Sequence, residues 1–184
     1  MKSIFVLAAM TAAACGGGKG GGAAAKTADP AAANAAIPAD WKAKLEFVGE
    51  RDAKRGVSYV TPKGWVEGVI PGVRKPPEGA GLGFMTSYGV GTNCDGMCEA
   101  KEWGPIVDQV EFADLAKAGT VERDDQIAGR RAMLAKVGER TIYAVAWWKT
   151  GAKHYVTCRA TLDGPLAAAA PAFIAACDAT QPNL

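Results

Sequence analysis

The second half of the chain most strongly constrains the fold, because it has the pattern of four consecutive β-strands with short connections. Gly129, Gly138 and Gly151 fall where tight hairpin turns are needed between the runs. The segment 142–148 is apolar on both faces, which is typical of a central strand covered on both sides. The runs that together predict an antiparallel meander are 120–127, 131–137, 141–149 and 154–162.

Helices are predicted before and after this meander. Pro105 fits the first position of a helix over 106–118. The residues expected on one stripe of that helix are Ile106, Val110, Ala113 and Lys117. A closing helix over 165–179 follows the last strand, and shorter alternating runs at 44–48, 57–61 and 82–88 predict further strands. The expected class is α+β: an antiparallel sheet, with the meander in its C-terminal half, and helices packed on it as in an α/β/α sandwich.

The N-terminus has the pattern of a bacterial export signal. Lys2 supplies a positive charge, residues 4–10 form a short apolar run, and small residues lead up to Cys15. This pattern resembles the lipoprotein signal peptide, although Ala12 stands where that family usually carries Leu. The resemblance implies that residues 1–14 are removed and that Cys15 is diacylated. An ordinary secretory signal that contains a cysteine is the alternative.

Residues 15–40 are predicted to form a flexible Gly/Ala-rich tether behind the lipidated cysteine. The segment lacks Val, Leu, Phe, Tyr and Trp, so we expect it to bury too little apolar surface to pack. One globular domain is then predicted over 41–184. Gly16 stands where lipoproteins held at the inner membrane carry an acidic residue. The resemblance therefore implies an outer-membrane location, facing the periplasm or the cell surface.

Two short motifs resemble PsbP-like domains. The run at 57–61 leads into Pro-Lys-Gly-Trp at 62–65, and Ile-Ala-Gly-Arg-Arg-Ala at 127–132 is similar to a glycine-centred hairpin of that family. The order of elements from 44 to 177 is also similar. This resemblance implies an α/β/α sandwich that binds or stabilises larger assemblies and has no conserved catalytic chemistry.

Four further cysteines predict disulfides, because exported proteins fold in an oxidising compartment. Cys158 shares a face of the last strand with residues 156 and 160, and Cys177 lies on the buried stripe of the closing helix. Packing of that helix on the sheet brings the two cysteines together. Cys94 and Cys98 are then left to pair with each other across a short loop.

The Cys94–Cys98 loop also supports a second hypothesis, periplasmic thiol-redox or copper chemistry. A pair of cysteines three residues apart, after a strand and before a helix, resembles the copper-binding loop of Sco-type proteins, and Met97 adds a soft ligand. That family completes its site with a distal histidine, for which His154 is the single candidate. Because the loop lacks the prolines of that family and the meander fits a thioredoxin fold poorly, a structural disulfide is favoured, and no metal or cofactor is expected.

Charge and reactive residues argue against several classes of function. A net charge of +2 gives no strongly basic surface for nucleic acid. No apolar run reaches the ~18 residues of a spanning helix, which argues against a polytopic membrane protein. Beyond the signal the only serines are Ser58 and Ser87, and the chain has one histidine, so a Ser-His-Asp hydrolase is not expected.

The sequence thus predicts a lipid-anchored protein of the bacterial cell envelope that is not an enzyme. We expect it to act by binding, or by supporting an envelope assembly, with the membrane and an envelope protein as its partners. No catalytic residue is predicted. Redox or copper handling at Cys94 and Cys98 is the alternative function.

Overall fold

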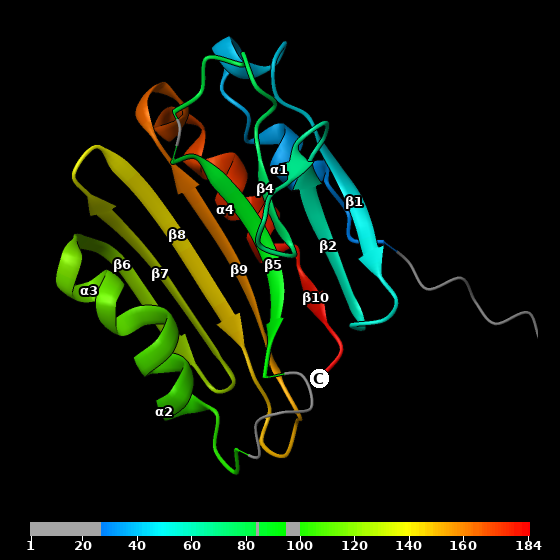
Figure 1. The fold of residues 1–184 in the computed structure, drawn as a ribbon, viewed down its shortest axis with the longest axis vertical. Helices are drawn as coiled ribbons and strands as arrows, with labels where there is room; N and C mark the ends of the chain where they lie inside the picture. Colours follow the sequence, from blue (N-terminus) through cyan, green and yellow to red (C-terminus); the bar gives the residue numbers. More distant parts are fainter. Residues whose placement is uncertain (1–26, 84, 95–99) are drawn as a thin grey trace, which may run out of the picture.

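A computed structural model describes residues 27–83, 85–94 and 100–184, and its main feature is a seven-stranded sheet (Figure 1). The strand order is β3-β4-β5-β9-β8-β7-β6, and neighbouring strands are antiparallel. The strands are β3 (Val66–Glu67), β4 (Val73–Lys75), β5 (Ser87–Asn93), β6 (Thr120–Ile127), β7 (Arg130–Val137), β8 (Arg140–Trp147) and β9 (Tyr155–Leu162). The predicted α+β class with an antiparallel sheet is confirmed.

The predicted meander corresponds to β6–β9. Gly129 and Gly138 adopt left-handed backbone at the two tight turns, with φ of 74° and 61°. β8 lies between β7 and β9, and its residues 141–146 are all buried. The apolar pattern of 142–148 therefore marked a central strand correctly.

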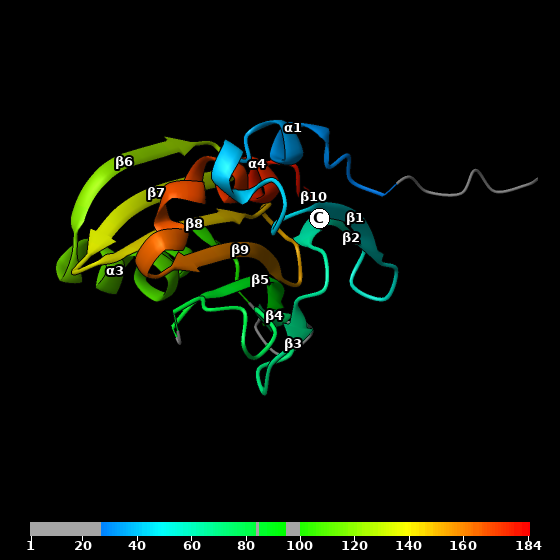
Figure 2. The ribbon, with the colours of Figure 1, turned by 90° about the horizontal axis from the view of Figure 1, so that it is seen from above.

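A smaller sheet lies beside the β3–β5 end of the large one (Figure 2). Its strands are β1 (Phe47–Asp52), β2 (Val57–Pro62) and β10 (Gln181–Pro182), with β2 in the centre. The first strand thus begins at Phe47 rather than at 44. The strand predicted at 82–88 is also displaced: β5 begins only at Ser87, because the Thr86 N–H donates to the Gly83 carbonyl at 2.9 Å and so closes a turn just before it.

Helices cover both faces of the large sheet, as an α/β/α sandwich requires (Figure 2). One face carries the 3-10 helix η3 (Gly164–Ala169) and helix α4 (Ala170–Asp178), and the other carries α2 (Gly104–Val107), the π-helical segment η2 (Asp108–Phe112) and α3 (Ala113–Ala118). Phe173 fills the core on the α4 side, and Phe112 fills the core on the α3 side. The adjacent Trp147 and Trp148 divide between these two cores, as strand alternation requires.

The stripe predicted for the 106–118 helix is wrong. Val110 is 61% exposed and Ile106 is 36% exposed, whereas Val107 and Phe112 are fully buried. Ile106 lies one residue before the buried Val107, so the predicted stripe begins one position off the buried face. The π-helical segment then widens one turn, which places the next buried residue, Phe112, five positions after Val107. A sequence pattern that assumes 3.6 residues in every turn does not reveal the additional residue in the π-helical turn.

The prediction that residues 15–40 form an unpacked tether is wrong for the part that the structure describes. Ala28, Ala33 and Ile37 are 1%, 0% and 6% exposed and belong to the core on the α4 side. Helix α1 (Ala31–Ala35) packs on α4, and a 3-10 turn, η1 (Ala39–Trp41), follows it. Small alanine side chains allow this close approach and lose no rotamer freedom on burial.

Asn34 fastens the same segment to the small sheet. Its side-chain amide donates a hydrogen bond to the Phe47 carbonyl at 2.9 Å, and its side-chain oxygen accepts one from the Phe47 N–H at 2.8 Å. Residues 1–26, with the predicted signal and Cys15, lie outside the described residues. No helix within the described ranges is long and apolar enough to cross a membrane.

Candidate functional site

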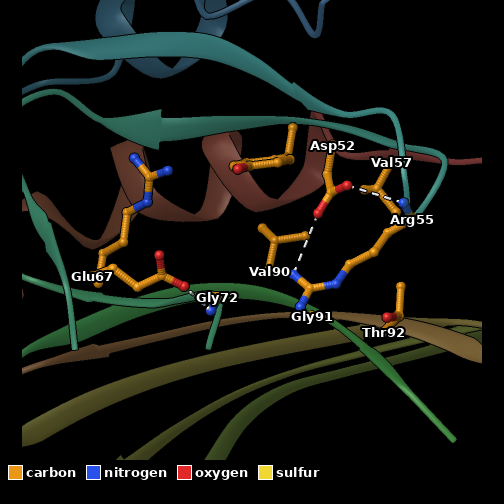
Figure 3. A pocket seen from close by; sticks show the side chains of 10 residues that line it. Asp52, Arg55, Val57, Glu67, Gly72, Val90, Gly91 and Thr92 are labelled. Atoms are coloured by element: carbon orange, nitrogen blue, oxygen red, sulfur yellow. Dashed lines mark hydrogen bonds and ion pairs between the residues drawn. The ribbon is translucent and has the colours of Figure 1, made fainter. Parts of the chain in front are cut away.

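A polar cleft of about 130 Å³ lies where the small sheet meets the β4–β5 end of the large sheet (Figure 3). Side chains from β1, β2 and the turn between them form one wall, and the chain from Gly72 to β4, with β5, forms the other. The charged residues that line the cleft are Asp52, Arg55, Glu67 and Arg74. The cleft therefore holds charges of both signs at the joint between the two sheets.

A hydrogen-bonded charge network ties the two sheets together at the back of the cleft. Arg74 on β4 donates two hydrogen bonds to the carboxylate of Glu50 on β1, at 2.9 and 2.6 Å. The Tyr59 hydroxyl on β2 donates a third, at 2.9 Å. Burial alone would raise the pKa of Glu50, but the hydrogen bonds from Arg74 and Tyr59 outweigh it and lower this pKa below its ordinary value. Glu50 is thus held as a carboxylate.

The same network fixes the protonation of Tyr59. Burial and then the hydrogen bond to the Glu50 carboxylate raise the pKa of the Tyr59 hydroxyl. The phenol therefore remains a hydrogen-bond donor. Its proton is directed at Glu50 rather than into the cleft.

The mouth of the cleft is formed by residues at the β1–β2 turn. Asp52 accepts a hydrogen bond from the Arg55 backbone N–H at 3.0 Å, and its carboxylate lies 3.4 Å from the Arg55 guanidinium. Figure 3 shows the Arg55 side chain reaching from this turn toward Gly91 and Thr92 of β5. Arg55 keeps 35% of its side chain exposed.

Gly72 shapes the opposite wall because the backbone passes directly over β5 at this residue. A Cβ atom at Gly72 would lie 2.6 Å from the Val90 carbonyl oxygen, and its φ of +79° is left-handed. The Val90 N–H donates to the Gly72 carbonyl at 3.2 Å, and the Gly72 N–H donates to Glu67 at 2.7 Å. Only glycine fits this approach without moving the hairpin.

A second hollow of about 200 Å³ adjoins the cleft on the other side of Gly72. Ile70, Pro71 and Val73 supply its apolar border, and Arg159 of β9 and Glu111 of η2 supply charges of opposite sign. The tip of the β3–β4 hairpin projects above it, with Val69 98% exposed and Ile70 61% exposed. The polar cleft and the apolar hairpin tip thus form one continuous surface.

This surface combines a polar part with an apolar part. The Glu50–Arg74–Tyr59 network holds the cleft walls in place, Asp52 and Arg55 bring charges to the mouth, and the hairpin tip carries apolar area that stays in contact with water. Of the chemically active residues that the sequence predicts, the structure describes Cys94, His154, Cys158 and Cys177, and none of these four lines either hollow. The predicted sites lie elsewhere.

Cys158 and Cys177 stand at disulfide distance, with their sulfur atoms 1.99 Å apart. They join β9 to α4, and both are buried in the core on the α4 side. The Tyr88 hydroxyl lies 3.3 Å from the Cys158 sulfur and donates to the Val60 carbonyl at 2.6 Å. This cysteine pair therefore belongs to the packed interior.

Cys94 closes the described part of the second cysteine loop, directly after β5. It is disulfide-bonded and has a left-handed φ of 61°. Met97 and Cys98 lie outside the described residues, so the pairing of Cys94 with Cys98 stays a prediction. His154 lies next to this end of β5, because Asn93 pairs with Tyr155 in the sheet and Cys94 and His154 are the next residues along. Among the described residues no cluster of three metal-ligating side chains is found.

Sequence reasoning did not find the cleft residues Tyr59, Arg74 and Arg55, nor Glu50, which holds Tyr59 and Arg74. They stand on strands and turns that are distant in the sequence, so no motif connects them. Glu50 and Asp52 do alternate along one strand, which places two carboxylates on a common face. That alternation was a readable signal, but the pairing with Arg74 depends on how two separate sheets meet.

Comparisons with known proteins find similarity among solved structures but not among sequences. No protein-family model matches the chain, and no curated protein sequence matches it. Among solved structures, the chain is similar to the Ran-binding protein Mog1p from Saccharomyces cerevisiae, with 11% sequence identity and a TM-score of 0.49. The likeness covers 76% of this chain and 96% of that one.

Proposed function

We propose that this protein is a lipid-anchored cell-envelope domain that binds a protein partner and contributes no catalytic chemistry. The signal-like N-terminus and Cys15 support the anchor. The hairpin tip beside the polar cleft supports binding. Localisation in the bacterial envelope, at the outer membrane, belongs to the same proposal.

The observation that carries the proposal is the apolar hairpin tip. Val66, Val69 and Ile70 are 55%, 98% and 61% exposed on one short hairpin. The tip is held in shape, because the Val73 N–H donates to the Ile70 carbonyl at 3.0 Å and the Gly68 N–H donates to the Val73 carbonyl at 2.7 Å. A preformed apolar anchor lowers the entropic cost of association.

The cleft supplies the polar surroundings that such an anchor needs. Arg55 and Asp52 stand at its mouth, and Arg159 borders the adjoining hollow. Charged groups around an apolar centre give register and specificity to a protein–protein contact. We therefore expect a partner that covers the hairpin tip and hydrogen-bonds to the cleft mouth.

A matched pair of variants tests this surface. Val69→Ser combined with Ile70→Ser removes the apolar tip, and Ile127→Ser changes a side chain of similar exposure, 63%, on the far edge strand β6. We expect the tip variant to lower recovery of the partner with the full chain at least about tenfold, as loss of a binding anchor does. The Ile127 variant should bind normally. Equal recovery of the partner with both variants would refute the hairpin tip as the binding surface.

The anchor is tested separately with Cys15→Ser. We expect the native chain to carry a lipid on Cys15, detected as added mass on the N-terminal peptide, and to sediment with membranes. The variant should lose both properties and still fold. An unmodified, soluble native chain would refute the anchor and leave the binding surface to be judged by the previous experiment.

A second candidate function is periplasmic thiol-redox or copper handling at Cys94, Met97, Cys98 and His154. One observation favours it: the Nε2 atom of His154 is buried and has no hydrogen-bond partner among the described residues. The sheet register also brings His154 to the end of β5, next to Cys94. Cu(I) bound at one equivalent by the reduced chain, and lost in Cys94→Ser with Cys98→Ser, would favour this function; unchanged partner binding in that variant would favour the first.

A further inference from the structure

A separate hollow of about 220 Å³ lies at the opposite end of the joint between the sheets, among η1, the β2–β3 turn and η3. Leu166 and Leu45 form its floor and are 0% and 6% exposed, and Trp65 forms a wall and is 8% exposed. The half-buried Trp41 and Leu82 complete its apolar border. This hollow shares no lining residue with the polar cleft or with the second hollow beneath the hairpin tip.

One charged residue borders this apolar hollow, Lys44. Its ammonium stands over the Trp41 ring, 5.6 Å from the ring centroid. No carboxylate in the described part of the chain forms an ion pair with Lys44, whereas the exposed Lys63 pairs with Glu46 at 2.8 Å. The hollow thus combines an indole-lined interior with one cation that no carboxylate neutralises.

We propose that this hollow binds a small organic anion with an apolar body, such as a carboxylate on a short aliphatic chain or on a fused ring. The apolar body would fill the space between Trp41, Trp65 and Leu166. The anionic group would lie beside the Lys44 ammonium at the edge of the hollow. This ligand site is independent of the protein-binding surface proposed above.

The size of the hollow limits the ligand. An apolar cavity of about 150 Å³ accepts benzene. A volume of about 220 Å³ therefore suits a somewhat larger body, a bicyclic ring or a chain of roughly eight carbons. The charge pattern limits it further, because a cationic head would be placed against the Lys44 ammonium.

Three ligands that differ only in the head group test the charge preference. Octanoate, octanol and octylamine are titrated calorimetrically into the full chain carrying Cys15→Ser, and the change in tryptophan emission, to which Trp41 and Trp65 contribute, gives a second signal. We expect octanoate to bind most tightly and octylamine at least about tenfold more weakly. Binding in the reverse order, or no saturable binding of octanoate, would overturn the proposal.

Three variants test the location. Lys44→Gln should weaken octanoate about fivefold and remove its advantage over octanol, in keeping with a solvent-exposed ion pair. Ala80→Phe, at an exposed position on the border, should fill the hollow and weaken octanoate and octanol at least about tenfold. Lys42→Gln changes a neighbouring exposed lysine that does not line the hollow, and should leave both affinities unchanged.

The variants also separate a specific site from general affinity for amphiphiles. The exposed positions of residues 42, 44 and 80 make normal thermal unfolding the expected result for all three variants. If neither Lys44→Gln nor Ala80→Phe weakened octanoate binding in a folded chain, the proposed ligand site would be overturned. A loss of the same size with Lys42→Gln would also overturn it, because attraction to surface charge would then explain the binding.

Discussion

Individual residues at the joint between the sheets carry the most specific energetic prediction. Glu50 and Arg74 come from different sheets, and their side chains are 34% and 24% exposed. Glu50→Gln leaves the Arg74 guanidinium without its charged acceptor, so we expect the free energy of unfolding to fall by about 1–2 kcal/mol. Glu46→Gln breaks the exposed pair with Lys63 and should cost less than about 0.5 kcal/mol. Denaturant unfolding of both variants makes the comparison; equal losses would contradict a special role for Glu50.

Glu50 also predicts a pH dependence. Its pKa in the folded chain lies below the ordinary value of 4.5, so on acidification the unfolded chain takes up this proton first. The stabilisation is complete above pH 4.5 and is lost as the pH falls through the folded pKa. Unfolding measured from neutral pH to about pH 3 should therefore show a steeper acid loss in the native chain than in Glu50→Gln. Parallel curves would contradict this assignment.

At the scale of elements, the link between β9 and α4 is the strongest covalent constraint that the described residues show. The cysteines are 19 residues apart, and closing a loop of this size stabilises a fold by about 3 kcal/mol in the chain-entropy model. Cys158→Ala with Cys177→Ala should lower the free energy of unfolding by about that amount without changing the secondary structure seen by circular dichroism. A loss below about 1 kcal/mol would show that helix packing alone holds α4.

The helix over 104–118 gives a second prediction, in which the structure and the sequence pattern disagree. Phe112 is fully buried against the sheet, whereas Val110 is 61% exposed. Phe112→Ala should lower the free energy of unfolding by about 3–5 kcal/mol, and Val110→Ala by less than about 0.5 kcal/mol. If Val110→Ala lowered the free energy of unfolding more than Phe112→Ala, the placement of a π-helical segment at 108–112 would be wrong.

The sequence predicts strands better than it predicts helix faces here, for a physical reason. Strand alternation depends on adjacent residues alone, so β6–β9 and the opposite orientations of Trp147 and Trp148 follow from the local pattern. The helix face depends on the number of residues in each turn, which the π-helical segment changes. The approach of Cys158 to Cys177 follows from an alternating strand and a buried helix stripe. The Glu50–Arg74 pair depends on the meeting of two sheets, which no local pattern encodes.

On the scale of the whole molecule, the segment from Ala28 to Ile37 is part of the domain and not a spacer in front of it. Ala28 lies against Gly49, where a Cβ atom would come within 2.1 Å of the Ala28 carbonyl oxygen. We expect Gly49→Ala to displace this segment, to speed amide hydrogen exchange over 28–37 and to lower the free energy of unfolding by about 1–3 kcal/mol. Unchanged exchange over 28–37 would contradict the packing of α1 on α4.

This packing also changes the interpretation of the N-terminal region. Composition alone suggested that alanine-rich chain would not order, because alanine buries little area per residue. The structure shows that helix α4 and Asn34 provide partners for that small area. Any flexible connection between Cys15 and the domain is therefore confined to residues that precede Ala28.

The most direct test of the proposed binding function is photo-crosslinking in intact cells of the native host. A photoreactive amino acid replaces Val69 at the hairpin tip in one full-length chain and Ile127 on β6 in another, and adducts are identified by mass spectrometry. We predict a single major protein adduct from position 69, absent from position 127 and lost when Ile70→Ser is added. No position-69 adduct, or the same set of adducts from both positions, would contradict a binding surface at the hairpin tip.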